Sequence, residues 1–322
     1  MKIMILGLGV IGTTYAYAFQ KAGFETEHLI REQKRNACPK EISVKLLDGR
    51  RTPKGEDVRD TYTVHLAQPD SRYDLILVSV SGGRLKEAVH TLNSSRISGT
   101  ILLCNGVSEE RSELNSILQG RKYLLGYPVA GGQMDMENTQ MDCVLFDHIM
   151  LEREDRAAVS NYADIVSLFE KAGIKTECPY DMLEWIWLHM AINAGVITAA
   201  AAAGSMADSA AAARKLMGSA PALSRAILVI RECVKIAEAR GVDLRNYKTE
   251  LLPYRLPAVL SGCIMKHLFR TNRLTRQIME LHANKDDLLY VCGSVYREGR
   301  RLHVPAPRFY ENYESALRAL EE

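Results

Sequence analysis

The fold class follows from the stretch at the start of the chain, Lys2-Ile3-Met4-Ile5-Leu6-Gly7-Leu8-Gly9-Val10-Ile11-Gly12. Its first five residues form a short, mostly apolar run of the kind that builds a buried strand. The glycines fit the pattern G-x-G-x-x-G, and residues 10–22 continue with the apolar spacing of a helix before a second strand at 25–30. A glycine-rich turn between a strand and a helix predicts a β-α-β unit that binds a dinucleotide.

Each glycine of this motif has its own expected task. Gly7 permits a tight turn, Gly9 lets the backbone approach a pyrophosphate, and Gly12 allows the helix to pack closely. The helix N-terminus, at Val10 and Ile11, offers oriented N–H groups to the anion. We therefore expect these five residues to bind the pyrophosphate, and the alternative is a glycine turn without a ligand.

The end of the second strand indicates which dinucleotide binds. An NAD enzyme usually has an acidic residue there, which accepts from the ribose 2′-OH, whereas an arginine can receive the 2′-phosphate of NADP. Arg31 takes this place, with Lys34 and Arg35 close behind and Glu32 as the opposing carboxylate. The sequence thus predicts NADP as the cofactor and Arg31 as a ligand of its 2′-phosphate. A solvated basic turn is the alternative interpretation.

The strands that follow predict the rest of this domain. The runs at 73–80 and 100–104 are almost continuously apolar, as expected for parallel strands covered on both faces. The runs at 41–47 and 61–66 flank a polar segment and are typical of a strand pair joined by a loop. With helical stretches between them, these runs predict an α/β fold, a Rossmann-type doubly wound sheet.

Ligands of open parallel sheets bind outside the carboxyl ends of the strands. Ser81 follows the strand at 73–80, and Asn105 follows the strand at 100–104, so both are expected to border the cofactor and the cleft. An Asn-Gly pair after a strand is often only a turn. The glycine-rich segment 126–132 is expected to form a loop where substrate enters, or a plain turn.

The second half of the chain has a different pattern. After Tyr180 it consists of long amphipathic or alanine-rich segments with helical spacing. We therefore expect residues 1–178 to form an NADP-binding Rossmann-type domain that ends with a strand at 174–178, and residues 179–322 to form an all-helical substrate-binding domain. Polar residues interrupt the alanine-rich stretch at 191–213, which favours close helix packing over a membrane span.

Composition excludes several classes of function. The 322 residues suffice for two domains, and 47% apolar with 25% charged residues is typical of globular proteins. With 41 Lys and Arg against 39 Asp and Glu, the net charge of +2 gives no reason to expect nucleic acid or an anionic membrane as a partner. The seven cysteines never form C-x-x-C, and the histidines lack metal-ligand spacing. We expect reduced thiols, a cytoplasmic protein and no metal.

In these features the sequence resembles the ketopantoate reductase (2-dehydropantoate 2-reductase) family, whose members reduce a 2-keto acid with NADPH. The resemblance spans the whole chain and rests on the glycine motif, Arg31, Asn105-Gly106, Trp187-Leu188-His189-Met190-Ala191-Ile192-Asn193 and the segment 287–307. The helical signature of the family reads roughly W-x-K-L-x-x-N, with the lysine as general acid and the asparagine as substrate ligand. Trp187 and Asn193 match this signature.

The sequence departs from the family at three functional positions. His189 stands in place of the catalytic lysine, and Ser81 in place of a lysine that often follows the third parallel strand. Gly293 and the run at 303–307 set the register of the C-terminal signature, which places Asp287 where the family has a glutamate. The resemblance implies that Ser81 and Asn105 contact the cofactor and that His189, Asn193, Asp287 and Asn105 form the catalytic set. It supports the fold and cofactor more directly than activity on ketopantoate.

The chemistry can also be argued from the residues. Hydride transfer to a carbonyl carbon creates an alkoxide, which needs a proton donor. The imidazole of His189 has an ordinary pKa of about 6.5 and can donate near neutrality, and Asn193 lies one helical turn further on the same face. A core histidine is the alternative for His189, and a solvated acidic helix face, with Glu280 and Asp286 as competitors, is the alternative for Asp287.

These observations lead to one main hypothesis and two alternatives. The main one is an NADPH-dependent reductase of a small 2-keto acid, with a small carbonyl compound as its substrate and a homodimer as an open option. The second is another hydroxy-acid or opine-type dehydrogenase of the same build. The third, from a different class, is a protein that senses NADPH without turnover and signals to a partner.

Overall fold

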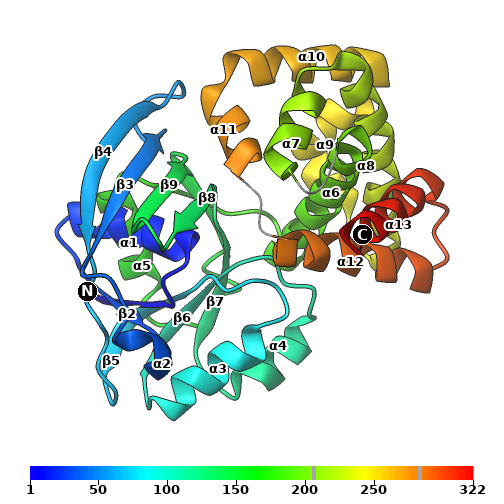
Figure 1. Cartoon of the computed structure of the whole chain (residues 1–322). Coiled ribbons are helices and arrows are strands. Elements are labelled where there is room, and N and C mark those ends of the chain that lie inside the picture. The colour runs from blue at the N-terminus through cyan, green and yellow to red at the C-terminus, as the bar shows by residue number, and fades with distance from the viewer. Residues whose placement is uncertain (205–207, 282–284, 322) are drawn as a thin grey trace. The chain divides into compact units, whose positions relative to one another are not determined.

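The computed structural model describes residues 1–204, 208–281 and 285–321, with side chains for all of these except 285–288 and 321 (Figure 1). The chain forms two compact units, Met1–Leu183 and Glu184–Glu322. The first unit is a mixed α/β structure, and the second consists of helices over its described residues. The fold class predicted from the sequence is therefore confirmed.

A seven-stranded sheet forms the centre of the first unit. Its strand order is β11-β10-β7-β6-β5-β1-β2. Neighbours from β7 to β2 are parallel, whereas β10 is antiparallel to β7. The strands are β1 (Lys2–Leu6), β2 (Glu25–Leu29), β5 (Arg72–Val78), β6 (Ser98–Cys104), β7 (Tyr123–Tyr127), β10 (His148–Leu151) and β11 (Lys175–Glu177).

This strand order contains a topological switch point. From β1 the chain passes to β2 on one side of it, and later returns to β5 on the other side. The connections that leave β1 and β5 therefore diverge, and a crevice outside the carboxyl ends of these strands is the usual place for a ligand in such sheets.

Helices cover both faces of the large sheet. They are α1 (Val10–Lys21), α2 (Glu32–Arg35), α3 (Leu85–Ser94), α4 (Arg111–Leu118) and α5 (Tyr162–Lys171). Figure 1 shows α3 and α4 together on one side of the sheet and α1 and α5 on the other. The buried rings of Tyr15 and Phe19 in α1 contact Phe169 in α5, with centroids 6.0 and 5.3 Å from it. This aromatic cluster joins two helices that are distant in sequence.

A second, four-stranded sheet has the order β4-β3-β9-β8. It comprises β3 (Glu41–Asp48), β4 (Glu56–Thr63), β8 (Ala130–Asp135) and β9 (Gln140–Leu145). The predicted pairing of 41–47 with 61–66 is confirmed as an antiparallel pair, but β4 begins at Glu56 and ends at Thr63. Its outward positions are charged because it is an edge strand, so its start could not be recognised from an apolar pattern.

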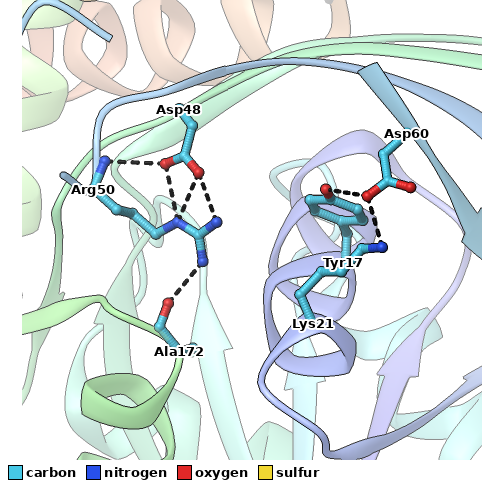
Figure 2. Close-up of polar contacts among 6 residues, drawn as sticks. All are labelled: Tyr17, Lys21, Asp48, Arg50, Asp60 and Ala172. Atoms are coloured by element: carbon cyan, nitrogen blue, oxygen red, sulfur yellow. Dashed lines mark hydrogen bonds and ion pairs between the residues drawn. The ribbon is translucent and has the colours of Figure 1, made fainter. Parts of the chain in front are cut away.

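Polar contacts attach the small sheet to the rest of the unit (Figure 2). Asp60 of β4 accepts a hydrogen bond of 2.9 Å from the Tyr17 hydroxyl and lies 2.6 Å from the Lys21 ammonium, both from α1. After β3, the Arg50 guanidinium pairs with Asp48 and donates a 2.7 Å hydrogen bond to the carbonyl of Ala172, just after α5. The small sheet is thereby held to both helices on its side.

The segment 126–132 is not the loop expected from its glycines. Gly126 lies in β7 and Gly132 in β8, and only Pro128 and Val129 separate these strands. A side chain at Gly126 would clash with Leu102, 2.8 Å from its Cβ position, and one at Gly132 would clash with the backbone of β9. These glycines therefore permit close approach of neighbouring strands as the chain passes from the large sheet to the small one.

In the second unit the long helix α6 packs against α8, which is almost as long. Its helices are α6 (Met182–Ala203), α7 (Ser209–Met217), α8 (Ala220–Arg240), α9 (Lys248–Arg255), α10 (Ala258–Thr271), α11 (Arg273–Leu281), α12 (Lys285–Arg301) and α13 (Pro307–Glu321), with a short 3-10 turn at Leu244–Tyr247. Gly195 of α6 approaches Ile230 of α8 so closely that a Cβ would lie 2.7 Å from its Cα. Within the described ranges, α6 alone is long and apolar enough to span a membrane, and half of its most apolar stretch is buried in the protein.

Candidate functional site

The three glycines of the glycine-rich turn have different backbone environments. Gly7 has a φ of 85°, a conformation that glycine adopts without strain. A Cβ at Gly12 would lie 2.5 Å from the Ile5 side chain, so only glycine allows α1 to pack this closely on β1. At Gly9, by contrast, no heavy atom of the described residues lies within 4 Å of the Cβ position. The space at the N-terminus of α1 is open.

The N-terminus of α1 is also electrostatically suited to an anion. Among the described residues no side chain caps this helix, and its first turn, which begins at Val10 and Ile11, has no acidic residue. The first N–H groups of a helix lack partners within the helix, and the helix dipole favours negative charge there. The turn therefore offers N–H donors and open space at the same place, as a pyrophosphate requires.

A buried hydrogen-bond chain that sequence reasoning missed supports this turn. His28 of β2 lies 2.7 Å through Nδ1 from the carbonyl oxygen of Gly7 and 2.7 Å through Nε2 from the Tyr62 hydroxyl. A carbonyl only accepts, so Nδ1 carries the proton and the Tyr62 hydroxyl donates to Nε2. Burial lowers the pKa of His28 to about 4, although the bond to Gly7 opposes this shift. A histidine in an otherwise ordinary strand gives no sequence signal for this role.

Arg31 lies just after β2, as predicted, and is exposed. Its guanidinium lies 3.2 Å from the carboxylate of Glu87, in the first turn of α3. The side chain of Arg35, by contrast, is only 18% exposed, and its guanidinium donates a hydrogen bond to the carbonyl of Ala67. Lys34 is exposed beside them. Of the two arginines in this turn, Arg31 is the one placed to meet a ligand from solvent.

The ends of β5 and β6 supply the other predicted residues of this unit. Ser81 is half-buried in the turn between β5 and α3, and its carbonyl accepts from the Arg84 N–H. Asn105 directly follows β6, and its amide nitrogen makes a long hydrogen bond of 3.4 Å to the Gly106 carbonyl. Its oxygen Oδ1 is buried without a hydrogen-bond partner among the described residues. An unpaired buried acceptor costs about 1–3 kcal/mol, so a donor from a ligand would relieve it.

In the second unit, His189 and Asn193 lie on α6, one turn apart on one half-buried face. The imidazole of His189 stacks on the ring of Trp185, with centroids 4.8 Å apart and planes within 11°. This contact restrains the orientation of the imidazole. Asp287 lies in α12 by its backbone, and its side chain is outside the described part of the chain.

Trp187, part of the helical signature, has a structural neighbour that the sequence did not indicate. The Arg240 guanidinium of α8 lies 3.9 Å from the centroid of its buried ring, and the same guanidinium donates a 2.8 Å hydrogen bond to Glu298 of α12. This cation–π contact and ion pair connect α6, α8 and α12. Among the described residues no group of His, Cys, Asp and Glu could hold a metal ion.

The structure thus places the predicted residues in two groups. The first group lies in the first unit, at or just after the carboxyl ends of β1, β2, β5 and β6. It consists of Gly7, Gly9, Val10, Ile11, Gly12, Arg31, Ser81 and Asn105. His189 and Asn193 share a helix face in the second unit. The first group has the layout of a dinucleotide site at the switch point of a doubly wound sheet.

Comparisons with known proteins show what the chain is similar to. Residues 3–139 match the sequence model of the family described as ketopantoate reductase PanE/ApbA. No curated protein matches the sequence. A PanE/ApbA family ketopantoate reductase from Ralstonia eutropha JMP134 has a similar structure, with a TM-score of 0.68, 16% identity and coverage of 99% of this chain and 98% of that one.

Two other solved structures cover the whole chain. A dimeric ketopantoate reductase from Staphylococcus aureus has a TM-score of 0.62 at 13% identity and covers 100% of this chain and 99% of its own. A D-mandelate dehydrogenase, solved with NADH and anilino(oxo)acetate, has a TM-score of 0.65 at 13% identity, with coverage of 99% and 98%. At these identities the structures show a shared fold. The family match covers residues 3–139, which is less than half of the chain, and the solved structures show the same fold over nearly its whole length.

Proposed function

We propose that the protein is an NADPH-dependent reductase of a small 2-keto acid. In this proposal residues 1–178 bind the cofactor and residues 179–322 contribute the substrate-binding groups. The observation that carries it is the open glycine-rich turn at Gly9, where no side chain of the described residues caps the N-terminus of α1, whose first N–H groups have no acceptor within the helix. The match of residues 3–139 to the model of a ketopantoate reductase family supports the reaction class.

The residues of the first unit fit a bound NADPH. The pyrophosphate would lie on the N–H groups after Gly9, and Arg31 would pair with the 2′-phosphate. The half-buried Ser81 and Asn105 would face the nicotinamide end, where the unpaired Oδ1 of Asn105 could accept from the carboxamide of the ring. Bound there, NADPH supplies a hydride to the carbonyl carbon of the substrate.

The residues of the second unit would handle the substrate and its proton. His189 donates a proton to the oxygen that becomes the hydroxyl, from a ring oriented by Trp185. Asn193, on the same helix face, donates an amide hydrogen bond to the substrate. Asp287, in place of the family's glutamate, orients the substrate or holds His189 in its charged form.

The test is NADPH oxidation, followed at 340 nm, with a panel of 2-keto acids that includes ketopantoate, pyruvate and phenylglyoxylate. Turnover of at least one of them, with NADPH preferred to NADH, is the expected result. The sensor interpretation has one specific observation in its favour, the stacking of His189 on Trp185, which engages the ring in a structural contact. Tight NADPH binding without turnover of any compound in the panel would favour that interpretation.

We also propose that the protein is a cytoplasmic homodimer that uses the exposed face of α10. Of the eight large apolar side chains that are exposed in the described residues, five lie on α9 and α10: Leu252, Val259, Leu260, Ile264 and Leu268. A second copy would cover this surface, and one structural neighbour is described as dimeric. Light scattering should give a dimer for the wild type and a monomer for Ile264→Asp, with Met136→Asp, exposed on the other unit, as the control. A monomeric wild type would contradict this proposal.

A further inference from the structure

The carboxylate that faces Arg31 comes from a different element than the sequence suggests. Glu32, directly after Arg31, is 91% exposed and lies 3.9 Å from Arg35. Glu87, from the first turn of α3, is the group that pairs with Arg31, at 3.2 Å. The side chains of this pair are 57% and 52% exposed, so both can reach a ligand in solvent.

We propose that Glu87 is a specificity-determining residue that limits the preference for NADPH over NADH. The proposal rests on the proposed function, in which Arg31 receives the 2′-phosphate. That phosphate carries a charge of about −1.5 to −2 at neutral pH. To bind it, Arg31 must either release Glu87 or hold two anions at once, and in both cases the Glu87 carboxylate lies near a second anion.

NADH makes neither demand on this pair. Its ribose carries a neutral 2′-OH, which does not displace Glu87 from Arg31 and is not repelled by a carboxylate. Glu87 therefore lowers the affinity for NADPH and leaves the affinity for NADH unchanged. Exposed ion pairs are weak, which keeps the penalty small enough for NADPH still to bind.

The substitution Glu87→Gln removes the charge and keeps the size of the side chain. We expect it to tighten NADPH binding about three- to tenfold, or about 0.7–1.4 kcal/mol at 1.4 kcal/mol per tenfold change. NADH affinity should stay within about twofold. Glu32→Gln is the matched control, because it removes a carboxylate from the same turn that is paired with Arg35 rather than Arg31.

The experiment is titration calorimetry of the full chain with NADPH and with NADH, for the wild type, Glu87→Gln, Glu32→Gln, Arg31→Ala and the double variant. In the Arg31→Ala background the effect of Glu87→Gln on NADPH should shrink, because the competition for the guanidinium no longer exists. The gain should also shrink in about 0.5 M NaCl, since exposed charges are screened there.

Two results would overturn the inference alone. If Glu87→Gln leaves NADPH affinity unchanged, the carboxylate is too far from the 2′-phosphate to matter. If it weakens NADPH binding, Glu87 holds Arg31 in place rather than competing for it. Failure of the proposed function would look different: the wild type would bind neither dinucleotide, or it would bind NADPH and turn over no compound in the 2-keto acid panel.

Discussion

Protonation of His28 should destabilise the first unit at acid pH. The ring is fully buried, donates to Gly7 and accepts from Tyr62, so it is held in its neutral form with a pKa of about 4. In the unfolded chain the pKa of histidine is about 6.5. Between these values the unfolded chain binds the proton and the folded one does not. The contribution of neutral His28 to the free energy of unfolding is therefore fully present above about pH 6.5. It decreases as the pH is lowered and is lost below about pH 4.

The magnitude follows from the gap between the two pKa values. At 1.36 kcal/mol for each pKa unit, the gap corresponds to about 3 kcal/mol of unfolding free energy. This is a large part of the stability of an ordinary domain. Acidic groups elsewhere also change stability with pH, so the contribution of His28 must be isolated from theirs.

The assay compares the wild type with His28→Gln, which cannot titrate, by urea unfolding followed by circular dichroism from pH 4 to 8. The difference in unfolding free energy between the two proteins should change by about 3 kcal/mol in favour of the variant as the pH falls from 7 to 4. Tyr62→Phe should lower stability by about 1–3 kcal/mol at pH 7, because Nε2 then loses its donor. A difference between wild type and His28→Gln that stays constant with pH would refute the reasoning.

Four further predictions concern function and stability. Arg31→Ala should weaken NADPH binding about ten- to a hundredfold with little effect on NADH, as measured by calorimetry, since it removes a charge-assisted hydrogen bond. Asn105→Ala and Asn193→Ala should lower turnover while thermal melting changes little; a loss of several kcal/mol with normal kinetics would assign a structural role instead. His189→Gln should slow the chemical step about 10²- to 10⁴-fold in single-turnover kinetics and remove the decline of reduction at high pH, and an unchanged pH profile would exclude His189 as the acid. Glu232→Ala should lower the melting temperature through a loss of about 1–3 kcal/mol, because the buried Phe309 N–H at the start of α13 loses its acceptor while the exposed Arg308 stays solvated, and unaltered melting would contradict that role.

The sequence predicted what depends on local pattern. The three glycines of the first turn each have a steric requirement that a short motif reveals, and β1, α1 and β2 follow from apolar spacing. Arg31 and Asn105 could be found because they directly follow strands whose carboxyl ends must meet at one edge of a parallel sheet.

Contacts between elements that are distant in the chain could not be predicted from the sequence. Glu87 pairs with Arg31 only because α3 begins near the end of β2, and His28 reaches Gly7 and Tyr62 only because β1, β2 and the end of β4 come together. The glycines at 126–132 predict a loop, because glycine occurs in turns more often than between closely packed strands. In this segment the tertiary packing against Leu102 and β9 determined the residue type.

The parallel pairing of β3 with β9 has a consequence for how the protein can be divided. Residues 3–139 correspond to the family match, yet β9 begins at Gln140 and pairs with β3 from Ser43 to Asp48. A fragment that ends at residue 139 would leave β3 with an open edge and would lack Ala172, the acceptor for Arg50. The segment that sequence comparison delimits is thus shorter than the first compact unit, Met1–Leu183, and a truncated expression fragment should extend at least through β11, to Glu177.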